Sequence, residues 1–331
     1  MTQATRKVEF FDADIRLDRW FKRNLPAVPH GMLVKWLRTG QVRVDGKRAE
    51  AGTRLTVGAE IRIPPMPLLT DQPKPEAAPR PVTEEDARDL KRGVLYQDES
   101  VIVLNKPYGL AVQGGPGITK HLDGMLDALA NEAGERPRLI HRLDRDTSGV
   151  LVLGRTAQAA SRLAAAFRGR DARKLYWAVV AGRPVPVEGR LDLALGKEGT
   201  GGQERMVPQT GKNASHAATL YRTLDHAARK LAWLELIPLT GRTHQLRVHC
   251  KELGAPILGD GKYGGAAAHV TGLVGKMHLH ARKLSIPHPA GGWLTVEAPL
   301  PPHMQATFTD LGFTAAPPKP PLRSRAAPEA G

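Results

Sequence analysis

The pattern of apolar and polar positions predicts a small unit of helix and strands at residues 15–63. Apolar side chains first recur there at the spacing of one helical face, at Val28, Met32, Leu33, Trp36 and Leu37. Two stretches that alternate between apolar and polar residues follow, QVRVDG at 41–46 and AEIRIP at 59–64. The Asp45-Gly46 pair is typical of a tight turn between strands. We therefore expect a helical stretch followed by two short strands.

Beyond this segment, predicted strands and helices alternate along the chain. Strand patterns occur at 100–105, 149–154, 174–182 and 230–239, and helical patterns at 122–133 and 157–169. Thr83 is placed to cap a short helix at the start of this region. No G-x-G-x-x-G motif follows a strand, which argues against a dinucleotide-binding unit. The pattern predicts an α+β domain built around a mixed β-sheet.

Proline content marks the boundaries between these regions. Seven of the nineteen residues at 64–82 are proline, which rules out a helix or a central strand and indicates a linker. Residues 315–331 are also rich in proline and have little to bury, so we expect a disordered tail. The main domain is then expected to span residues 83–314.

The segment at residues 15–63 has a high positive charge for a small domain. The whole chain has a net charge of +15, and residues 15–63 hold eleven Lys and Arg against four Asp and Glu. Such a balance is typical of proteins that bind polyanions. The order of the IRLDRWF, WLRTGQVRVDGKRA and LTVGAEIRIP stretches resembles the S4 RNA-binding domain. The resemblance implies RNA contacts by basic residues of this segment, for which the candidates are Arg16, Arg19, Lys35, Arg38, Arg43 and Lys47.

Cysteine content and hydropathy bear on the compartment. A single cysteine, Cys250, excludes an internal disulfide and a cysteine-built zinc site, and we expect it to be a small buried side chain. The first twenty residues lack the apolar run of a signal peptide, and no later run reaches the length of a membrane span. We expect a soluble cytoplasmic protein with no membrane partner.

The densest group of polar residues is HRLDRDTSG at 141–149, which lies between two predicted strands. Loops at strand ends often carry catalytic groups. Asp144 and Asp146 would face the same way in an extended segment but would be separated by a turn. From the residues alone, one of them is a candidate for a chemical carboxylate. Surface ion pairs with Arg142 and Arg145 are the simpler alternative.

A second group, TGRTHQLRVH at 240–249, is rich in histidine and arginine. The spacing does not match a common metal-binding motif such as H-E-x-x-H, so no metal site is predicted. An arginine of this group could instead pair with a buried aspartate. Such a pair would keep the carboxylate ionised and oriented.

Four motifs occur together in one order: NKPYGLAVQGG at 105–115, HRLDRDTSG at 141–149, KLYWAVVAG at 174–182 and TGRTHQLRVH at 240–249. In order and spacing the chain resembles the pseudouridine synthases of the RluA family, and with the S4-like segment it is most similar to the RluC type of the ribosomal large subunit. The resemblance implies that Asp144 is the catalytic residue and Arg242 its ion-pair partner. It also implies that Tyr176 packs beside the target uracil.

The same resemblance implies how RNA is handled. Leu246 would lie beneath the base, and Arg142 would fill the space that a flipped-out uridine leaves. Core packing is the simpler alternative for Leu246 and Tyr176. For Arg142 the simpler alternative is a phosphate contact. The implied reaction isomerises specific uridines of 23S ribosomal RNA, free or in large-subunit assembly intermediates, without a cofactor. A monomer suffices. The alternatives are the same chemistry on transfer RNA, a non-catalytic RNA-binding protein, and a glycoside hydrolase, which would require a second acid.

Overall fold

The computed structural model describes residues 4–9, 12, 15–25, 28–65, 82–115, 117–199, 204–211, 214–228 and 230–314. The chain divides into two compact units, Met1–Pro75 and Glu76–Gly331. Residues 66–81 of the expected linker and the whole of the expected tail, 315–331, lie outside the described residues. Among the described helices, none is long and apolar enough to span a membrane. The two units are considered separately below.

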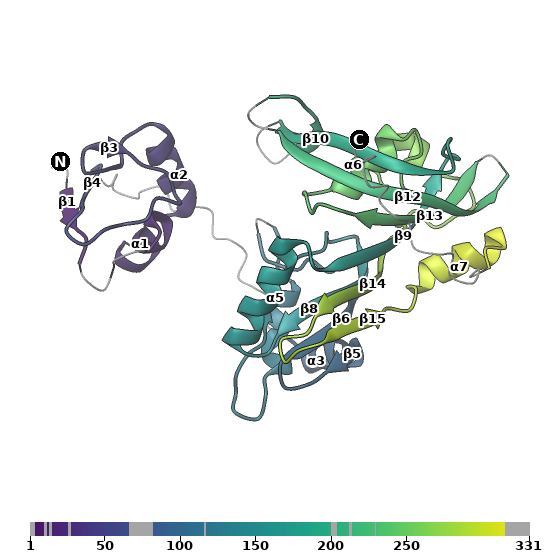
Figure 1. The fold of residues 1–331 in the computed structure, drawn as a ribbon, viewed down its shortest axis with the longest axis horizontal. Helices are drawn as coiled ribbons and strands as arrows, with labels where there is room; N and C mark the ends of the chain where they lie inside the picture. The colour runs from purple at the N-terminus through teal and green to yellow at the C-terminus, as the bar shows by residue number, and fades with distance from the viewer. Residues whose placement is uncertain are drawn as a thin grey trace, which may run out of the picture. The chain divides into compact units, whose positions relative to one another are not determined.

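Within its described residues, the N-terminal unit combines two helices with a small antiparallel sheet (Figure 1), whose strand order is β1-β4-β2-β3. Its elements are β1 (Ala4–Lys7), α1 (Leu17–Asn24), α2 (His30–Arg38), β2 (Arg43–Val44), β3 (Lys47–Arg48) and β4 (Glu60–Ile63). Apolar faces of both helices and of β4 form one core, in which Trp20 and Phe21 are almost completely buried. The predicted helix and strands therefore form one packed body.

Two features of this unit differ from the prediction. The sheet includes β1, which lies before the expected start at residue 15 and pairs with β4. The Asp45-Gly46 turn, in which both residues have a positive φ, joins β2 to the short β3 and not to the strand at 59–64. That strand, β4, instead pairs with β2 from its other side. The β2–β3 hairpin was not visible as alternation, because these strands have two residues each.

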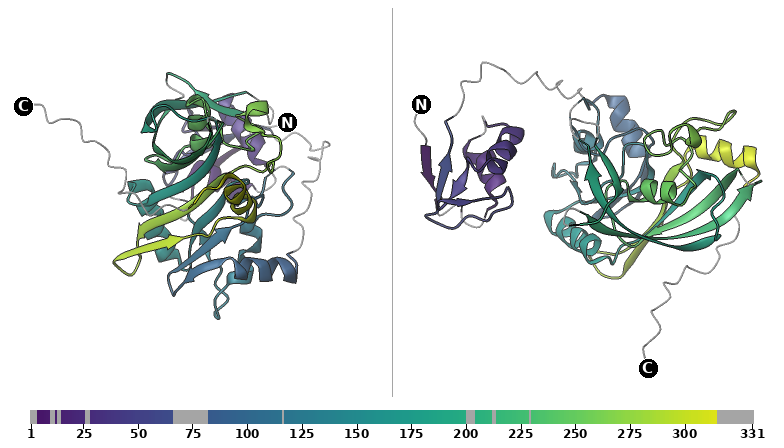
Figure 2. Two further views of the ribbon diagram at one scale, coloured as in Figure 1. Left: turned by 90° about the vertical axis from the view of Figure 1, so that its right-hand side faces the viewer. Right: turned by 90° about the horizontal axis from the view of Figure 1, so that it is seen from above.

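The second unit contains, within the described residues, an eleven-stranded sheet. Along the sheet the order is β11-β10-β12-β13-β9-β14-β8-β6-β5, with β15 paired to β14 and β7 paired to β8. Most of these strands are labelled in Figure 1, and Figure 2 shows the same sheet from two further sides. The strands are β5 (Val94–Gln97), β6 (Val101–Lys106), β7 (Arg138–Leu139), β8 (Ser148–Gly154), β9 (Arg173–Ala181), β10 (Glu188–Glu198), β11 (Arg205–Pro208), β12 (Ser215–Ala227), β13 (Leu231–Pro238), β14 (Leu279–Pro287) and β15 (Trp293–Glu297). Strands β14 and β8 run parallel and the other pairs antiparallel, so the predicted mixed sheet in an α+β fold is confirmed.

Helices cover both faces of this sheet. They are α3 (Glu84–Arg92), α4 (Leu122–Met125), α5 (Ala157–Gly169), α6 (Gln245–Glu252) and α7 (Pro302–Leu311), with 3-10 turns η2 (Leu126–Leu129) and η3 (Gly265–Ala268). On one face, β9 and β13 pack against α6, while β6 and β8 pack against α4 and η2. On the opposite face, α7 covers β9 and β13, and α5 covers β6 and β8. Tyr176 of β9 packs against both clusters of the first face.

The predicted helices agree with the structure where their ends are defined by local chemistry. The Thr83 hydroxyl accepts from the Asp86 backbone N–H, and the Asp86 carboxylate accepts from the Thr83 N–H, so α3 begins with the expected cap. The helix predicted over 122–133 is wrong beyond residue 129. There the side-chain oxygen Oδ1 of Asn131 accepts from the Glu135 backbone N–H at 2.7 Å, and this bond favours a turn in place of further helix.

Gly149 allows the two parallel strands of the sheet to approach closely. Its φ is +108°, and a Cβ built there would lie 2.2 Å from the carbonyl oxygen of Ala281 in β14. Ala281 in turn pairs with Tyr176 of β9. The glycine that ends the HRLDRDTSG motif therefore aligns this motif with Tyr176 across three neighbouring strands.

Candidate active site

Asp144 lies in the loop that leads from β7 into β8. The Thr147 backbone N–H donates to the Asp144 carbonyl at 3.1 Å and closes a turn there. The turn separates the two aspartates of the motif, because Asp146 forms a long, 3.9 Å ion pair with exposed Arg145 whereas Asp144 faces other partners. The side chain of Asp144 is 28% exposed, so its carboxylate is held by the protein and is still accessible.

Lys106, from the NKP motif at the end of β6, supports this turn from inside the protein. Its ammonium group donates to the carbonyl oxygens of Pro107 (2.9 Å), Leu110 (2.8 Å) and Arg145 (3.0 Å). Only 1% of Lys106 is exposed, and burial lowers its pKa to about 7, although the two aspartates of the loop raise it. Three carbonyl acceptors match the three N–H groups of a lysine ammonium. Lys106 thereby connects the 107–110 loop to the loop that carries Asp144.

His141 anchors the start of the same loop. Its ring stacks on Phe167 of α5 with a centroid distance of 4.3 Å, and Nε2 accepts from the Val152 N–H at 2.9 Å. Burial lowers the pKa of His141 to about 3, with a further lowering by Lys174. The imidazole is therefore neutral at physiological pH and holds the loop against β8.

Among the described residues, Arg247 and His244 form the close ion-pair contacts with the Asp144 carboxylate. Nη1 of Arg247 lies 3.6 Å from Oδ2 of Asp144, and Nε2 of His244 lies 3.8 Å from the same oxygen. Arg247 is itself fixed by a bidentate salt bridge with Asp260, in which the N–O distances are 2.8 and 2.7 Å. Burial lowers the pKa of Arg247, but its bonds to Asp260 outweigh this and raise it. The site therefore holds one fixed cation against the carboxylate.

The expected pair of Asp144 with Arg242 is wrong. The Arg242 guanidinium donates from Nε to the carbonyl oxygen of His216 at 3.0 Å, at the exposed end of the loop. Arg247 stands in its place, because it lies inside α6, where the helix covers the sheet, whereas Arg242 precedes the helix. One sequence signal could have found it. An arginine between apolar Leu246 and Val248 is more often buried than one next to a glycine.

Gln245 shapes the loop between Arg242 and His244. Its side-chain oxygen accepts from the Thr240 hydroxyl (2.7 Å) and from the Arg242 N–H (3.0 Å). Its amide NH2 donates to the carbonyl of Ala218 and to the hydroxyl of Thr219, both at 2.9 Å. All of these partners are buried or part-buried, so this single amide fixes the loop on β12.

The other expected site residues fall into two groups. Tyr176 is half-buried and packs against the cluster that contains Leu143, the neighbour of Asp144, and burial followed by the charge of Asp144 raises its pKa. Leu246 is 7% exposed and packs in the α6 cluster that Tyr176 also contacts. Arg142 is exposed, and within the described ranges its guanidinium has no hydrogen bond or ion pair. The structure thus brings Tyr176 to Asp144 and leaves Arg142 directed to solvent.

The basic residues proposed for RNA contact in the N-terminal unit share one property. All of them are exposed: Arg16, Arg19, Lys35, Arg38, Arg43 and Lys47. Arg16 pairs with Asp18 at 2.7 Å, and Arg43 donates to the carbonyl of Gly46 at 3.0 Å. These bonds are at the surface and can be exchanged for contacts with a polyanion at small cost.

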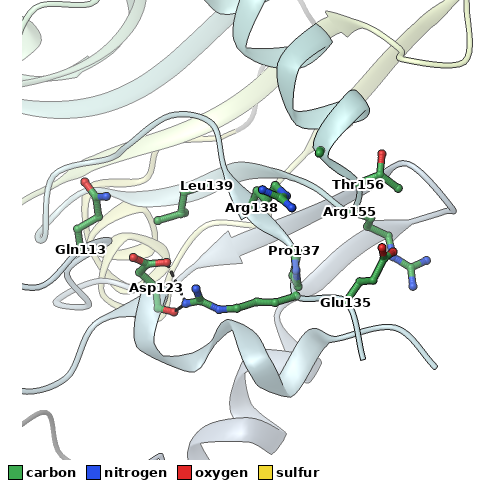
Figure 3. Close-up of a pocket in the computed structure, with 10 residues that line it drawn as sticks. Gln113, Asp123, Glu135, Pro137, Arg138, Leu139, Arg155 and Thr156 are labelled. Carbon is green, nitrogen blue, oxygen red and sulfur yellow. Dashed lines mark hydrogen bonds and ion pairs between the residues drawn. The ribbon is translucent and has the colours of Figure 1, made fainter. Parts of the chain in front are cut away.

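A groove of about 520 Å³ lies where β7 leads into the Asp144 loop (Figure 3). Its lining includes Arg138 and Leu139 of β7, Gln113, and the residues around Thr156 at the start of α5. An Asp123–Arg136 ion pair closes one side. Arg138 is exposed and forms no side-chain bond within the part of the chain that the structure describes. The groove therefore presents a cation at the end of β8, where Arg138 pairs with Gly154, while the Asp144 loop enters β8 at its other end, Ser148.

Two other side chains bear on the possible chemistry. Cys250 is completely buried in α6, and burial raises the pKa of its thiol to about 12, so it is inert as expected. Across the described residues, no group of three or more His, Cys, Asp or Glu is placed to hold a metal ion.

Comparison with known proteins gives consistent similarities. A family model described as RNA pseudouridylate synthase matches residues 100–252. Ribosomal large subunit pseudouridine synthase C of Vibrio cholerae serotype O1 is 32% identical over 320 residues, covering 94% of this chain and 99% of the relative. RNA pseudouridine synthase 4, mitochondrial, of Arabidopsis thaliana is 35% identical over 377 residues, covering 88% and 78%. The solved structure of human RNA pseudouridylate synthase domain containing 4 is 32% identical and has a TM-score of 0.58, covering 68% of this chain and 95% of that chain.

Proposed function

Because the chain belongs to the RluA family of RNA pseudouridine synthases, which isomerise uridine in RNA, we propose that Asp144 is its catalytic residue. One observation carries this assignment. Asp144 is a partly exposed carboxylate whose Oδ2 lies beside the fixed cation of Arg247 at 3.6 Å. A nearby cation keeps the carboxylate ionised, which both nucleophilic and basic roles require.

The reaction requires little beyond this carboxylate and a place to hold the base. Asp144 attacks C1′ of the ribose, or removes the 2′ proton to give a glycal, and the N1–C1′ bond breaks. The uracil turns and rejoins the sugar through C5, which then loses its proton. Tyr176 and Leu246 provide the apolar surface against which the base turns. No cofactor takes part in this scheme.

Access to Asp144 requires that the uridine leave its stack, which costs a few kcal/mol. We propose that Arg142 occupies the vacated space, since it is exposed next to the catalytic loop. The groove with Arg138 is proposed to hold the phosphate backbone beside the target. The exposed basic residues of the N-terminal unit, as an S4-like domain at residues 15–63, extend this contact to folded RNA.

The proposed substrate is 23S ribosomal RNA, free or in a large-subunit assembly intermediate. The support is the similarity to an enzyme named for the ribosomal large subunit and the basic N-terminal unit. A monomer is sufficient, since Asp144, Tyr176 and Arg247 all come from one chain. A cytoplasmic location stays a prediction.

The test is to map pseudouridines in ribosomal RNA from cells that lack the gene. Wild type, Asp144→Asn and the control Asp146→Asn are then restored separately. We expect certain sites to vanish and to return with wild type and with Asp146→Asn, but not with Asp144→Asn. Return of the sites with Asp144→Asn would contradict the catalytic assignment. If no ribosomal site is lost, the target is wrong and transfer RNA is tested next.

A further inference from the structure

His244 has an unusual backbone for its position beside Asp144. It is the residue just before α6, and its φ of 53° lies in the left-handed region that residues other than glycine rarely adopt. Its carbonyl accepts the Val248 N–H at 3.0 Å, so the conformation is fixed by the start of the helix. Conformations of this kind persist where the surrounding structure holds them, and they cluster at functional sites. The backbone at His244 determines where its side chain points, so we ask what function that direction serves.

Hydrogen bonds around Tyr263 determine where the proton of His244 lies. The Tyr263 oxygen accepts from the Met206 N–H at 3.1 Å, and it lies 2.7 Å from Nδ1 of His244. The tyrosine hydroxyl has one proton to donate, and Nδ1 of His244 is the acceptor that the described residues place within reach, so we assign the bond as Tyr263 O–H to Nδ1. A neutral imidazole that accepts at Nδ1 carries its proton on Nε2.

The neutral form is the favoured one in this surrounding. Burial lowers the pKa of His244, and the cations of Arg247 and Lys262 lower it further, against the carboxylates of Asp144 and Asp260. The Nε2–H group is therefore present as a donor without a charge of its own. It is directed toward Asp144, whose Oδ2 lies 3.8 Å away.

The two oxygens of Asp144 are thus in different surroundings. Both His244 Nε2 and Arg247 Nη1 face Oδ2, whereas Oδ1 has no hydrogen bond or ion pair to any described residue. A separation of 3.8 Å is longer than a hydrogen bond. Contacts of catalytic groups commonly shorten when the substrate binds, so a small closure would complete this one.

We infer that Tyr263 and His244 are positioning residues for Asp144. Tyr263 fixes the tautomer of His244, and the His244 Nε2–H together with Arg247 holds Oδ2, which leaves Oδ1 as the oxygen that reacts. This inference rests on the proposed catalytic role of Asp144. The ring of Tyr263 lies 5.0 Å from the Arg247 guanidinium, so a purely structural role is the alternative. The two roles differ in the kcat of the variants and in the tautomer of His244.

The first experiment compares Tyr263→Phe, His244→Asn and their double variant with wild type, using the RNA that the mapping identifies. Asparagine tolerates the left-handed backbone, so His244→Asn removes the ring with little strain. Tyr221→Phe is the matched control, because the Tyr221 hydroxyl donates to a backbone carbonyl of Pro186 at 3.1 Å, away from Asp144.

We expect Tyr263→Phe to lower kcat about tenfold with KM unchanged. The variant weakens the donation from His244 to the charged Asp144, which contributes to the chemical step and not to RNA binding. Tyr221→Phe should keep the wild-type kcat. The double variant should be no slower than His244→Asn, because Tyr263 acts through His244. Independent, multiplicative losses in the double variant would overturn the inference, as would a wild-type kcat for Tyr263→Phe.

The second experiment reads the tautomer directly by NMR of the full-length protein labelled with 15N-histidine, with His244→Asn to assign the signal. In wild type we expect the pattern of a ring protonated at Nε2, and in Tyr263→Phe a shift toward the Nδ1-protonated form. A wild-type ring protonated at Nδ1 would overturn the inference. Asp144→Asn in the same kinetic assay separates the two proposals, since activity there would overturn the proposed function as well, and its loss would not.

Discussion

Arg247 joins two carboxylates, and this double role allows stability and catalysis to be separated. It forms the bidentate salt bridge with Asp260, which is 1% exposed, and it faces Asp144 at 3.6 Å. Replacement by methionine keeps an unbranched side chain of similar length and removes the charge. The variant Arg247→Met therefore leaves Asp260 as a buried carboxylate without its cation.

The magnitude follows from that burial. Removing one partner of a buried ion pair costs about 3–5 kcal/mol. A second substitution, Asp260→Asn, removes the uncompensated charge but keeps the oxygen that accepts from the backbone N–H groups of Lys262 (3.1 Å) and Tyr263 (3.2 Å). We expect the double variant to recover to within about 1–2 kcal/mol of wild type.

Urea unfolding and single-turnover pseudouridine formation are measured on the same proteins. The single variant Arg247→Met and the double variant with Asp260→Asn should both react at least about tenfold more slowly than wild type, because Asp144 has lost its cation in each. Arg190→Met is the control, since the exposed pair of Arg190 with Asp192 contributes about 0–1 kcal/mol. Recovery of both stability and rate in the double variant would refute the role of Arg247 at Asp144. Wild-type stability of Arg247→Met would refute the estimate for the buried pair.

Three further predictions follow from the fold and the groove. Four buried histidines have a pKa lowered by burial, to about 3 for His141 and about 4 for the others, which are His249, His278 and His280. The unfolded chain binds protons below pH 6.5 and the folded chain does not. The free energy of unfolding should therefore fall from pH 6.5 toward pH 4 by up to about 1.4 kcal/mol per pH unit for each histidine. Urea midpoints measured from pH 7.5 to 4.5 test this, and a flat profile would contradict it. Gly149→Ala should lower the free energy of unfolding by about 3 kcal/mol, because its Cβ would meet a β14 carbonyl; a change below 1 kcal/mol in the same assay would count against the close approach. Arg138→Gln should weaken RNA binding and make its log–log salt dependence shallower by about 0.7–0.9, one phosphate contact, whereas the exposed control Arg183→Gln should not. Equal slopes for wild type and Arg138→Gln would exclude the groove as a phosphate site.

The sequence predicts those parts of the fold whose cause is local. The α5 helix begins after the capping hydroxyl of Thr156 and carries apolar residues at helical spacing, and both of its ends agree with the prediction. The helix predicted over 122–133 is wrong beyond residue 129, because the Asn131 side chain bonds to the Glu135 backbone and competes with helical hydrogen bonds. The spacing of apolar residues along the sequence gives no sign of this competing hydrogen bond.

The candidate site divides in a similar way. The motif around Asp144 and the strand of Tyr176 can be recognised along the chain, and the structure brings them together. Which arginine faces Asp144 depends on a carboxylate partner thirteen residues beyond Arg247, Asp260. Arg242 and Arg247 are five positions apart, and only the pairing with Asp260 and the start of α6 distinguish them. The left-handed backbone of His244 could not be predicted from the sequence, since only a few per cent of residues other than glycine have a positive φ.

The way the catalytic loop is supported has a consequence for how such enzymes diversify. Lys106, His141 and Gln245 hold the loops around Asp144 through bonds directed inward, whereas Arg138 and Arg142 face outward and form no bond within the described residues. Substitutions on the outward side change the RNA surface that the protein can accept and leave the reacting carboxylate in place. A gene duplicate can therefore drift to a new uridine through exposed positions alone, while the inward positions retain the chemistry that both copies share.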